Sequence, residues 1–401
     1  MSANILATVE LAPRDPILGL TEAYNADRNP KRVNLGVGVY YDEAGKVPLL
    51  KCVAQAEHSL VERASARSYL PIEGLPAYDR SVQALVFGAD CPALREGRII
   101  TVQSLGGTGG LKIGADFLRR LLPESHVWIS DPSWENHRAL FESAGFKVNT
   151  YPYYDAASHG LNFAGMLAAL RALPAQSIVV LHACCHNPTG VDLTASQWAE
   201  VVSAVREHDL VPFLDIAYQG FGAGIAADGE PVRLFAAAGI PVLVSNSFSK
   251  SFSLYGERVG SLSIVTTSSE EAARVLSQMK RVVRTNYSNP PTHGGQIVAT
   301  VLESPELRAL WEEELAGMRE RIRSMRERFV ALMRERVPQT DFSFIMNQRG
   351  MFSFSGLTKA QVTRLREEFG VYAVDSGRIC VAALNQNNIV YACDSIAKVL
   401  G

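Results

Sequence analysis

A lysine at the end of an apolar segment is the residue of this chain best placed for covalent chemistry. Lys250 ends the run Ser-Phe-Ser-Lys, shortly after a predicted strand at residues 241–247. Burial at a strand end disfavours the charged amine and leaves a nucleophile that can attack a carbonyl carbon. A lone lysine is more simply a solvated surface residue, so this interpretation depends on the residues around it.

Polar residues also accompany two other apolar segments. Asp215 lies inside the predicted strand at residues 211–216, and Tyr218 follows it by three residues. A buried carboxylate must be paired, either in a structural ion pair or with a cationic atom of a ligand. Asn187 begins the turn Asn-Pro-Thr-Gly after a further predicted strand. This turn needs no function, but at the border of a site it presents Asn187 as a hydrogen-bond donor.

A glycine-rich segment at residues 104–110 follows a strand and opens a predicted helix at 111–122. Small residues let backbone N–H groups approach an anion, and the helix N-terminus favours negative charge. The segment matches neither dinucleotide-binding nor P-loop patterns, because Lys112 stands three residues after Gly109 and no Gly-Lys-Ser/Thr follows. A tight turn that only requires small residues is an equal alternative.

Taken together, these segments describe one ligand. Its phosphate would bind the glycine-rich segment, Ser247 and the guanidinium of Arg258. Its protonated ring nitrogen would face Asp215, and its aldehyde carbon would face Lys250. A lysine Schiff base with an acidic partner for a pyridinium nitrogen is the usual arrangement of pyridoxal-phosphate enzymes. The sequence therefore predicts pyridoxal 5'-phosphate as the cofactor, with no metal.

The elements that must position these residues are short apolar strands alternating with helices. Such alternation predicts an α/β protein with a mostly parallel seven-stranded sheet that is covered on both faces. Ligands of open α/β sheets bind outside the carboxyl ends of the strands, where the polar residues above are found. The predicted strands occupy residues 98–105, 126–130, 146–151, 177–185, 211–216, 241–247 and 260–265.

A long amphipathic helix at residues 311–332 divides the chain into two domains. A coiled coil is the alternative, but charge pairing along the helix is weak. We predict an N-terminal arm and part of the small domain at 1–45, a large cofactor-binding domain at 46–310 and a smaller α+β domain at 311–401. In the smaller domain, 341–354 reads as two strands separated by a turn, and Thr358 with Gln361 forms a capping box.

Composition limits the possible partners. The 401 residues carry a net charge of -2 without a basic tail, which argues against nucleic acid and anionic membranes. No apolar run approaches the roughly 18 residues of a membrane helix, and the first ten residues show no secretory signal. Six cysteines do not make a disulfide framework in a chain of this length. We therefore expect reduced thiols and a cytoplasmic location.

Six separated motifs resemble the class I aminotransferases, and most closely the bacterial branch that acts on aspartate and aromatic (tyrosine-type) amino acids. The likeness runs from about Asp15 to the C-terminus and implies fold type I and a homodimer with active sites at the subunit interface. The motifs are VNLGVGVYYDEAGKVP (33–48), LHACCHNPTG (181–190), DIAYQGFG (215–222), SNSFSKSFSLYGERVG (245–260), NYSNPPTHG (286–294) and GMFSFSGL (350–357).

The resemblance implies a role for each cofactor contact. Lys250 would form the Schiff base and then carry a proton between the substrate α-carbon and the cofactor. Asp215 would keep the ring nitrogen protonated. Tyr218 and Asn187 would hydrogen-bond the phenolic oxygen, and Trp134 would stack on the ring. The phosphate would be held by Gly107, Thr108, Ser247 and Arg258.

Substrate binding is implied to use residues of two subunits. Arg378 would bind the α-carboxylate of the substrate. Arg284 of the neighbouring subunit would face the side-chain carboxylate of dicarboxylic substrates, and Tyr69 of that same subunit would reach the phosphate. Further substrate contacts would be Trp134, Asn187 and Gly38, the last of these on a mobile segment that closes over the substrate.

Two departures from the family pattern bear on stability and specificity. Gly110 stands where these enzymes usually have alanine, which should weaken the helix start by up to about 1 kcal/mol. Positions that differ between the aspartate and aromatic branches are mixed: Tyr41 and Val47 are of the aromatic type, whereas Val39, Thr108 and Asn289 are of the aspartate type. We therefore expect ping-pong transamination of both tyrosine or phenylalanine and aspartate, with 2-oxoglutarate as acceptor.

Other functions remain open at this stage. A strict aspartate aminotransferase, or another pyridoxal-phosphate reaction such as β-decarboxylation, would use the same lysine. The presence of both Arg284 and Arg378 favours transamination of dicarboxylates. A non-enzymatic regulator with this fold would need a DNA-binding module, for which we expect neither room nor charge.

Overall fold

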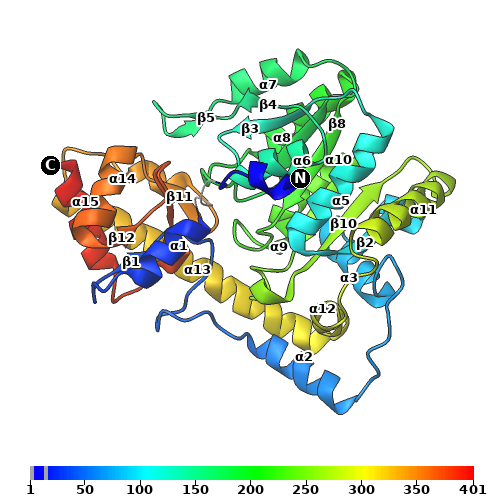
Figure 1. Cartoon of the computed structure of the whole chain (residues 1–401), viewed down its shortest axis with the longest axis horizontal. Helices are drawn as coiled ribbons and strands as arrows, with labels where there is room; N and C mark the ends of the chain where they lie inside the picture. Colours follow the sequence, from blue (N-terminus) through cyan, green and yellow to red (C-terminus); the bar gives the residue numbers. More distant parts are fainter. Residues whose placement is uncertain (1–3, 13–16) are drawn as a thin grey trace.

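The computed structural model describes residues 4–12 and 17–401. Asp15, where the family resemblance begins, lies outside the described residues. The molecule has two lobes (Figure 1). The larger lobe holds a seven-stranded sheet and the helices that cover it. The smaller lobe contains α1 (Leu18–Ala26), the short strands β1, β11, β12 and β13, and the helices α14 and α15.

The strands of the large sheet lie in the order β2-β10-β9-β8-β7-β3-β4. Only β10 runs antiparallel to its neighbours; the other pairs are parallel. The predicted sheet is thus confirmed, and each strand lies within a few residues of its predicted position. The bounds are β2 (Ile99–Leu105), β3 (Val127–Asp131), β4 (Val148–Pro152), β7 (Ile178–His182), β8 (Val211–Ile216), β9 (Val242–Ser247) and β10 (Val259–Val265).

Apolar residues on both faces of the strands explain why these segments read as continuous hydrophobic runs. Along β7, Ile178 and Val180 pack into one core and Val179 and Leu181 into the other. The first core is completed by α5 (Gly106–Leu121), α6 (Glu135–Ser143) and α11 (Ser269–Asn286). The second is completed mainly by α3 (Pro76–Phe87), α7 (Phe163–Arg171), α8 (Ala195–Glu207), α10 (Glu230–Ala237) and α12 (His293–Glu303).

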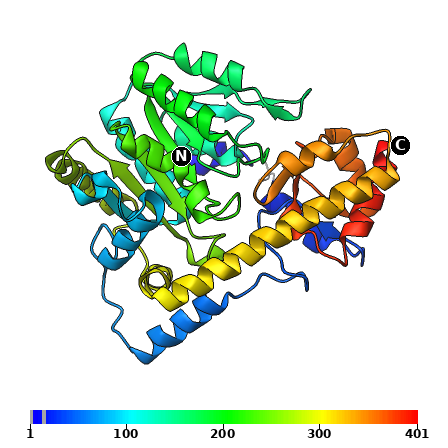
Figure 2. The same ribbon diagram turned by 180° about the vertical axis from the view of Figure 1, so that it is seen from behind.

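A single long helix joins the lobes, as Figure 2 shows from behind. This helix, α13 (Pro305–Arg336), is longer than the predicted 311–332 because Pro305 occupies its first turn and Ser304 caps it, accepting a hydrogen bond from the Leu307 N–H. Its buried side chains include Trp311, whose indole N–H donates to the Ser251 carbonyl at 2.7 Å. Among the described residues, no helix is long and apolar enough to cross a membrane.

The smaller lobe unites distant parts of the chain. Strand β1 (Val33–Asn34) pairs in parallel with β12 (Val371–Tyr372), and β11 (Phe352–Phe354) pairs antiparallel with β13 (Arg378–Cys380). The pairing of β1 with β12 supports our assignment of residues before 45 to the small domain, although the domain boundaries stay a prediction. The helices here are α14 (Lys359–Phe369) and α15 (Ile389–Leu400).

One predicted strand of the smaller lobe is wrong. Residues Ser343–Asn347 form a 3₁₀-helix, so only β11 remains of the two strands expected at 341–354. The Asp341 carboxylate accepts hydrogen bonds from the Ser343 backbone N–H at 2.7 Å and the Ser343 hydroxyl at 2.9 Å. Such local bonds compete with strand pairing. The predicted capping box of Thr358 and Gln361 is present at the start of α14.

Gly110 is required by close packing rather than merely tolerated. Helix α5 begins at Gly106, so the glycine-rich segment forms its first turns and lies against the sheet. A Cβ atom at Gly110 would lie 2.7 Å from the Ser261 carbonyl oxygen and 2.8 Å from the Ser245 hydroxyl. The expectation that Gly110 weakens the helix therefore has to be set against a steric clash that alanine would introduce here.

We predict that Gly110→Ala lowers the free energy of unfolding by about 1–3 kcal/mol because the added methyl overpacks this contact. Gly317→Ala is the matched control. Gly317 lies in α13, and apart from the backbone of its own helix a Cβ atom there has no heavy atom within 4 Å. This control should gain up to about 1 kcal/mol from helix propensity. Urea unfolding of both variants measures the difference, and a Gly110→Ala protein as stable as the wild type would show that the contact relaxes freely.

Candidate active site

A cavity of about 540 Å³ opens at the carboxyl ends of the central strands. Eleven of the thirteen residues predicted for the site line it. They come from both lobes, because the smaller lobe supplies Gly38 and Arg378. The eleven are Gly38, Gly107, Thr108, Trp134, Asn187, Asp215, Tyr218, Ser247, Lys250, Arg258 and Arg378.

Lys250 follows β9 and points its amine into this cavity. Burial lowers the pKa of Lys250 to about 8; Asp215 opposes this shift and Arg258 adds to it. The amine lies 4.9 Å from the centroid of the Tyr218 ring. A substantial fraction of the lysine is therefore neutral at slightly alkaline pH, as a nucleophile for a carbonyl carbon requires.

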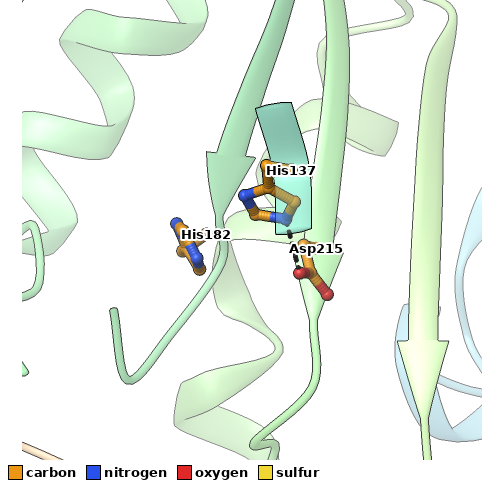
Figure 3. A group of neighbouring side chains, drawn as sticks. All are labelled: His137, His182 and Asp215. Carbon is orange, nitrogen blue, oxygen red and sulfur yellow. Dashed lines mark hydrogen bonds and ion pairs between the residues drawn. The ribbon is translucent and has the colours of Figure 1, made fainter. Parts of the chain in front are cut away.

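Asp215, at the end of β8, is a buried carboxylate that stays ionised. Its Oδ2 atom lies 3.0 Å from Nε2 of His137, a buried residue of α6 (Figure 3). Burial alone would raise the pKa of Asp215, but the hydrogen bond and electrostatic field of His137 hold it below the usual range. The Ser133 hydroxyl lies 3.0 Å from the other ring nitrogen of His137 and so fixes the imidazole.

His182, the last residue of β7, stands beside this pair (Figure 3). Burial, together with His137, lowers its pKa to about 3, so the ring is neutral. Neither of its nitrogens has a hydrogen-bond partner among the described residues. Atoms of His182, His137 and Asp215 lie within 4.8 Å of one another, a spacing that a metal ion also uses. The direct contact between His137 and Asp215, however, already engages one atom of each.

The sequence analysis missed both histidines. His137 lies three residues after Trp134, and His182 ends a predicted strand, but neither belongs to a spacing pattern that marks a site. The position of His182 at a strand end was the one available signal, since ligands bind at that edge of the sheet.

Arg378, in β13, is a buried cation whose hydrogen-bond donors are not all used. Its side chain is among the largest that are fully buried, at 1% exposure. One terminal nitrogen donates to the Asn187 side-chain oxygen at 3.0 Å and the other to the Gly36 carbonyl at 2.7 Å. The Nε atom is buried without a partner, and no carboxylate among the described residues forms an ion pair with this guanidinium. A buried charge without a counter-ion is costly, so this site is built for an anion.

A second anion site lies at the start of α5. The first turn of this helix presents backbone N–H groups beside Ser247, and the guanidinium of Arg258 closes the site. Gly106 has a φ of +67°, and a Cβ atom there would lie 2.6 Å from a terminal nitrogen of Arg258. The tight turn is therefore present and lets Arg258 approach the helix end, whereas phosphate binding there stays a prediction.

Aromatic side chains enclose the cavity. Trp134 precedes α6 and packs edge-on against His137, with ring centroids 5.3 Å apart. Phe352 lies under Arg378, whose guanidinium carbon is 4.2 Å from the ring centroid. Burial raises the pKa of Tyr218 well above its usual range, so its hydroxyl is protonated and available as a donor. These rings give the space between Lys250 and Arg378 a partly apolar lining.

Tyr69 and Arg284, the other two predicted site residues, do not line this cavity. Tyr69 is 90% exposed on the segment before α3. Arg284 lies exposed near the end of α11 and donates a hydrogen bond to the Ser288 hydroxyl. The single chain therefore leaves both residues on its surface, where only another molecule can use them.

Comparison with known families identifies this arrangement. The family described as aminotransferase class I and II matches residues 30–396. This chain belongs to the class I and II aminotransferases. The predicted family and the predicted fold class are thereby confirmed.

Close relatives carry two different substrate names. An aspartate aminotransferase from Pseudomonas aeruginosa is 62% identical over 397 residues, covering 99% of this chain and 100% of the relative. An aromatic-amino-acid aminotransferase from Escherichia coli is 53% identical over 387 residues, covering 96% and 98%. The crystal structure of an aromatic-amino-acid aminotransferase from Burkholderia pseudomallei, covalently bound to pyridoxal phosphate, superposes with a TM-score of 0.97 at 65% identity, covering 99% and 100%.

The lowered pKa of Lys250 has a kinetic consequence. Attachment of pyridoxal phosphate needs the neutral amine, so its second-order rate constant should rise with pH through a midpoint near 8, not 10.5. Reductive trapping followed by mass spectrometry of the cofactor-free protein measures this rate at low cofactor concentration. Nα-acetyl-lysine, whose side-chain amine is free, corrects under the same conditions for ionisation of the cofactor itself. If the rate constant of the protein depends on pH in the same way as that of Nα-acetyl-lysine, Lys250 is not desolvated.

Proposed function

We propose that this protein is a pyridoxal-phosphate-dependent aminotransferase that moves an amino group between aromatic or dicarboxylic amino acids and 2-oxoglutarate by a ping-pong mechanism. The observation that carries this proposal is the buried, unpaired guanidinium of Arg378, which shares one cavity with a partly neutral Lys250. An amino acid has one group for each: its carboxylate pairs with Arg378, and its amino-bearing carbon then lies in the cavity that Lys250 enters.

The residues present fit the cofactor at three separate points. The ionised Asp215 can pair with a cationic ring nitrogen deep in the cavity. The start of α5, with Arg258, can bind a phosphate. Lys250 supplies an amine for an aldehyde. These groups all line the same cavity, as a single elongated ligand with an anionic end and a cationic ring requires.

When bound, pyridoxal phosphate supplies an electrophilic carbon and an electron sink for the bond that is broken. The chain provides the remaining chemistry. The Nζ atom of Lys250 takes the proton from the substrate α-carbon and returns it on the cofactor side, which a lysine with a pKa near 8 can do in both directions. The carboxylate of Asp215 stabilises positive charge at the ring nitrogen, and His137 keeps that carboxylate ionised and oriented.

Arg378 fixes the orientation of the substrate. Its two terminal nitrogens are held by Asn187 and Gly36, so the plane of the guanidinium cannot turn when the substrate leaves. The face of Phe352 supports the same plane. A substrate carboxylate that pairs with Arg378 therefore finds a prearranged partner, and the loss of substrate entropy is the main remaining cost of binding.

Breadth of substrate use is the finer part of the proposal. Arg284 gives a bidentate partner for the distal carboxylate of aspartate or glutamate, provided that it reaches the cavity of a second chain. Tyr41 and Val47, of the aromatic type, make the region around the segment of Gly38 more apolar. The names of two relatives, aspartate aminotransferase and aromatic-amino-acid aminotransferase, support the same breadth.

The proposal includes a homodimer with shared active sites. Its support is the position of Tyr69 and Arg284, which lie on the surface of one chain although the family resemblance implies a role for both in the active site. The cytoplasmic location stays a prediction from the sequence.

One set of variants tests the substrates and the shared site together. Arg284→Ala should lower kcat/KM for aspartate by roughly 10²-fold or more and leave phenylalanine within a fewfold, because only aspartate needs the second guanidinium. Lys250→Ala should be inactive on both. A hybrid dimer of the two variants, purified with two different tags, contains one complete site and should recover activity on aspartate.

Two results would contradict the proposal. Equal losses on aspartate and phenylalanine in Arg284→Ala would remove the assigned role of this arginine and with it the account of substrate breadth. A hybrid that shows no aspartate activity after confirmed subunit exchange would mean that sites are not shared between chains.

A further inference from the structure

Gln103 is a buried hydrogen-bonding centre that the mechanism above does not use. It lies in β2, the edge strand of the large sheet, and is 1% exposed. Its side-chain oxygen accepts a hydrogen bond from the Leu75 N–H at 3.3 Å, and its side-chain amide donates to the Pro291 carbonyl at 2.8 Å. One amide therefore binds two segments that are more than 200 residues apart in the sequence.

The backbone of Gln103 connects the same two segments. Its N–H donates to the Glu73 carbonyl at 2.7 Å, and its carbonyl accepts from the Tyr287 hydroxyl at 3.0 Å. Residues 73–75 and residues 287–291 therefore both contact β2 at Gln103. Figure 1 and Figure 2 both show α3, β2 and α11 together at this end of the larger lobe.

Packing around this side chain is tight on both sides. A Cβ atom at Gly74, where φ is +112°, would lie 2.4 Å from the Gln103 Cβ. At Gly295, it would lie 2.6 Å from the Gln103 amide nitrogen. Glycine at these positions lets the segment 73–75 and the start of α12, which follows the segment 287–291, touch the glutamine directly, so a shift of the Gln103 side chain moves both of them.

Two further contacts join the segments without Gln103. The Asn289 side-chain amide donates to the Leu70 carbonyl at 3.0 Å. Lys280 of α11 forms an ion pair with Glu73 at 2.7 Å, partly shielded from solvent. The segment that carries Tyr69 and the segment that follows Arg284 are thus tied together as one rigid unit on the edge of β2.

We propose that Gln103 is a positioning residue that acts on the active site of the neighbouring chain, not on that of its own chain. It holds Tyr69 and Arg284 in a fixed mutual arrangement, so that both reach the partner's cavity together. This inference rests on the proposed shared site. Tyr69 and Arg284 are exposed side chains, and prearranging the segments below them reduces the entropy lost when they engage the partner's ligand.

The hybrid dimer described above separates the two chains. In it, the Lys250→Ala chain supplies Tyr69 and Arg284 to the one complete site, and the Arg284→Ala chain receives them. Gln103→Met keeps the length of the side chain but removes both of its hydrogen bonds. We place this substitution in the supplying chain of one hybrid and in the receiving chain of another, and measure kcat and KM for aspartate in both.

We expect Gln103→Met in the supplying chain to lower kcat/KM for aspartate by about tenfold or more, mainly through KM, because misplaced groups bind the distal carboxylate poorly. In the receiving chain the same substitution should leave kcat/KM within about twofold of the parent hybrid. Equal losses in both positions, or a loss only in the receiving chain, would overturn the inference, since Gln103 would then act locally through β2.

The parent hybrid serves as the internal control. If it shows no aspartate activity, the shared site itself is wrong; if it is active and the position of Gln103→Met makes no difference, only the present inference fails. Should Gln103→Met chains not assemble, Gln103→Asn takes their place, because the shorter side chain keeps the amide but cannot span both Leu75 and Pro291. The same asymmetry, with a smaller loss of about threefold or more, is then expected, and a symmetric result would again overturn the inference.

Discussion

The contact between Asp215 and His137 is the interaction on which the rest of the site depends. An ionised carboxylate inside a sheet is unfavourable unless a hydrogen bond and a compensating field accompany it. His137 provides both at 3.0 Å, and the pKa of Asp215 stays low despite burial. In the proposed function, the negative charge at this depth sets the position of a cationic ring. The position of this charge also determines where the amine of Lys250 must lie, because the amine has to reach a carbon of the same ligand.

Charge placement in the cavity follows from the way the chain is folded. The central strands bring Asp215 and Lys250 to one edge of the sheet, and the helix start of α5 adds a site for a phosphate there. Arg378 arrives from the smaller lobe, held by Asn187 of the larger lobe. The hydrogen bond between these two residues therefore makes the substrate site a property of both lobes, so any movement between them also moves the carboxylate-binding group.

Sequence patterns predicted the sheet well because its strands are buried on both faces and stand out as apolar runs, as at Val211–Ile216. The capping box at Thr358 was equally predictable from the sequence, since it depends on local chemistry. Prediction failed for two different reasons. Local hydrogen bonds of Asp341 turned a predicted strand into a 3₁₀-helix, whereas His137 is recognisable only after folding brings it to Asp215.

Residues that are proposed to act in another chain form a further class. Nothing in the fold of one chain assigns Arg284 to a site, and its proposed role came from the family resemblance alone. Gln103 shows the reverse case, because its contacts are clear in the structure and its position in the sequence belongs to no motif.

The role of Asp215 is the central claim, and the single-turnover rate of Asp215→Asn with aspartate tests it most directly. With cofactor content and thermal stability matched to the wild type, we predict a loss on the order of 10²–10³-fold, because the amide cannot balance positive charge at the ring nitrogen. An unchanged rate would show that Asp215 only stabilises the fold.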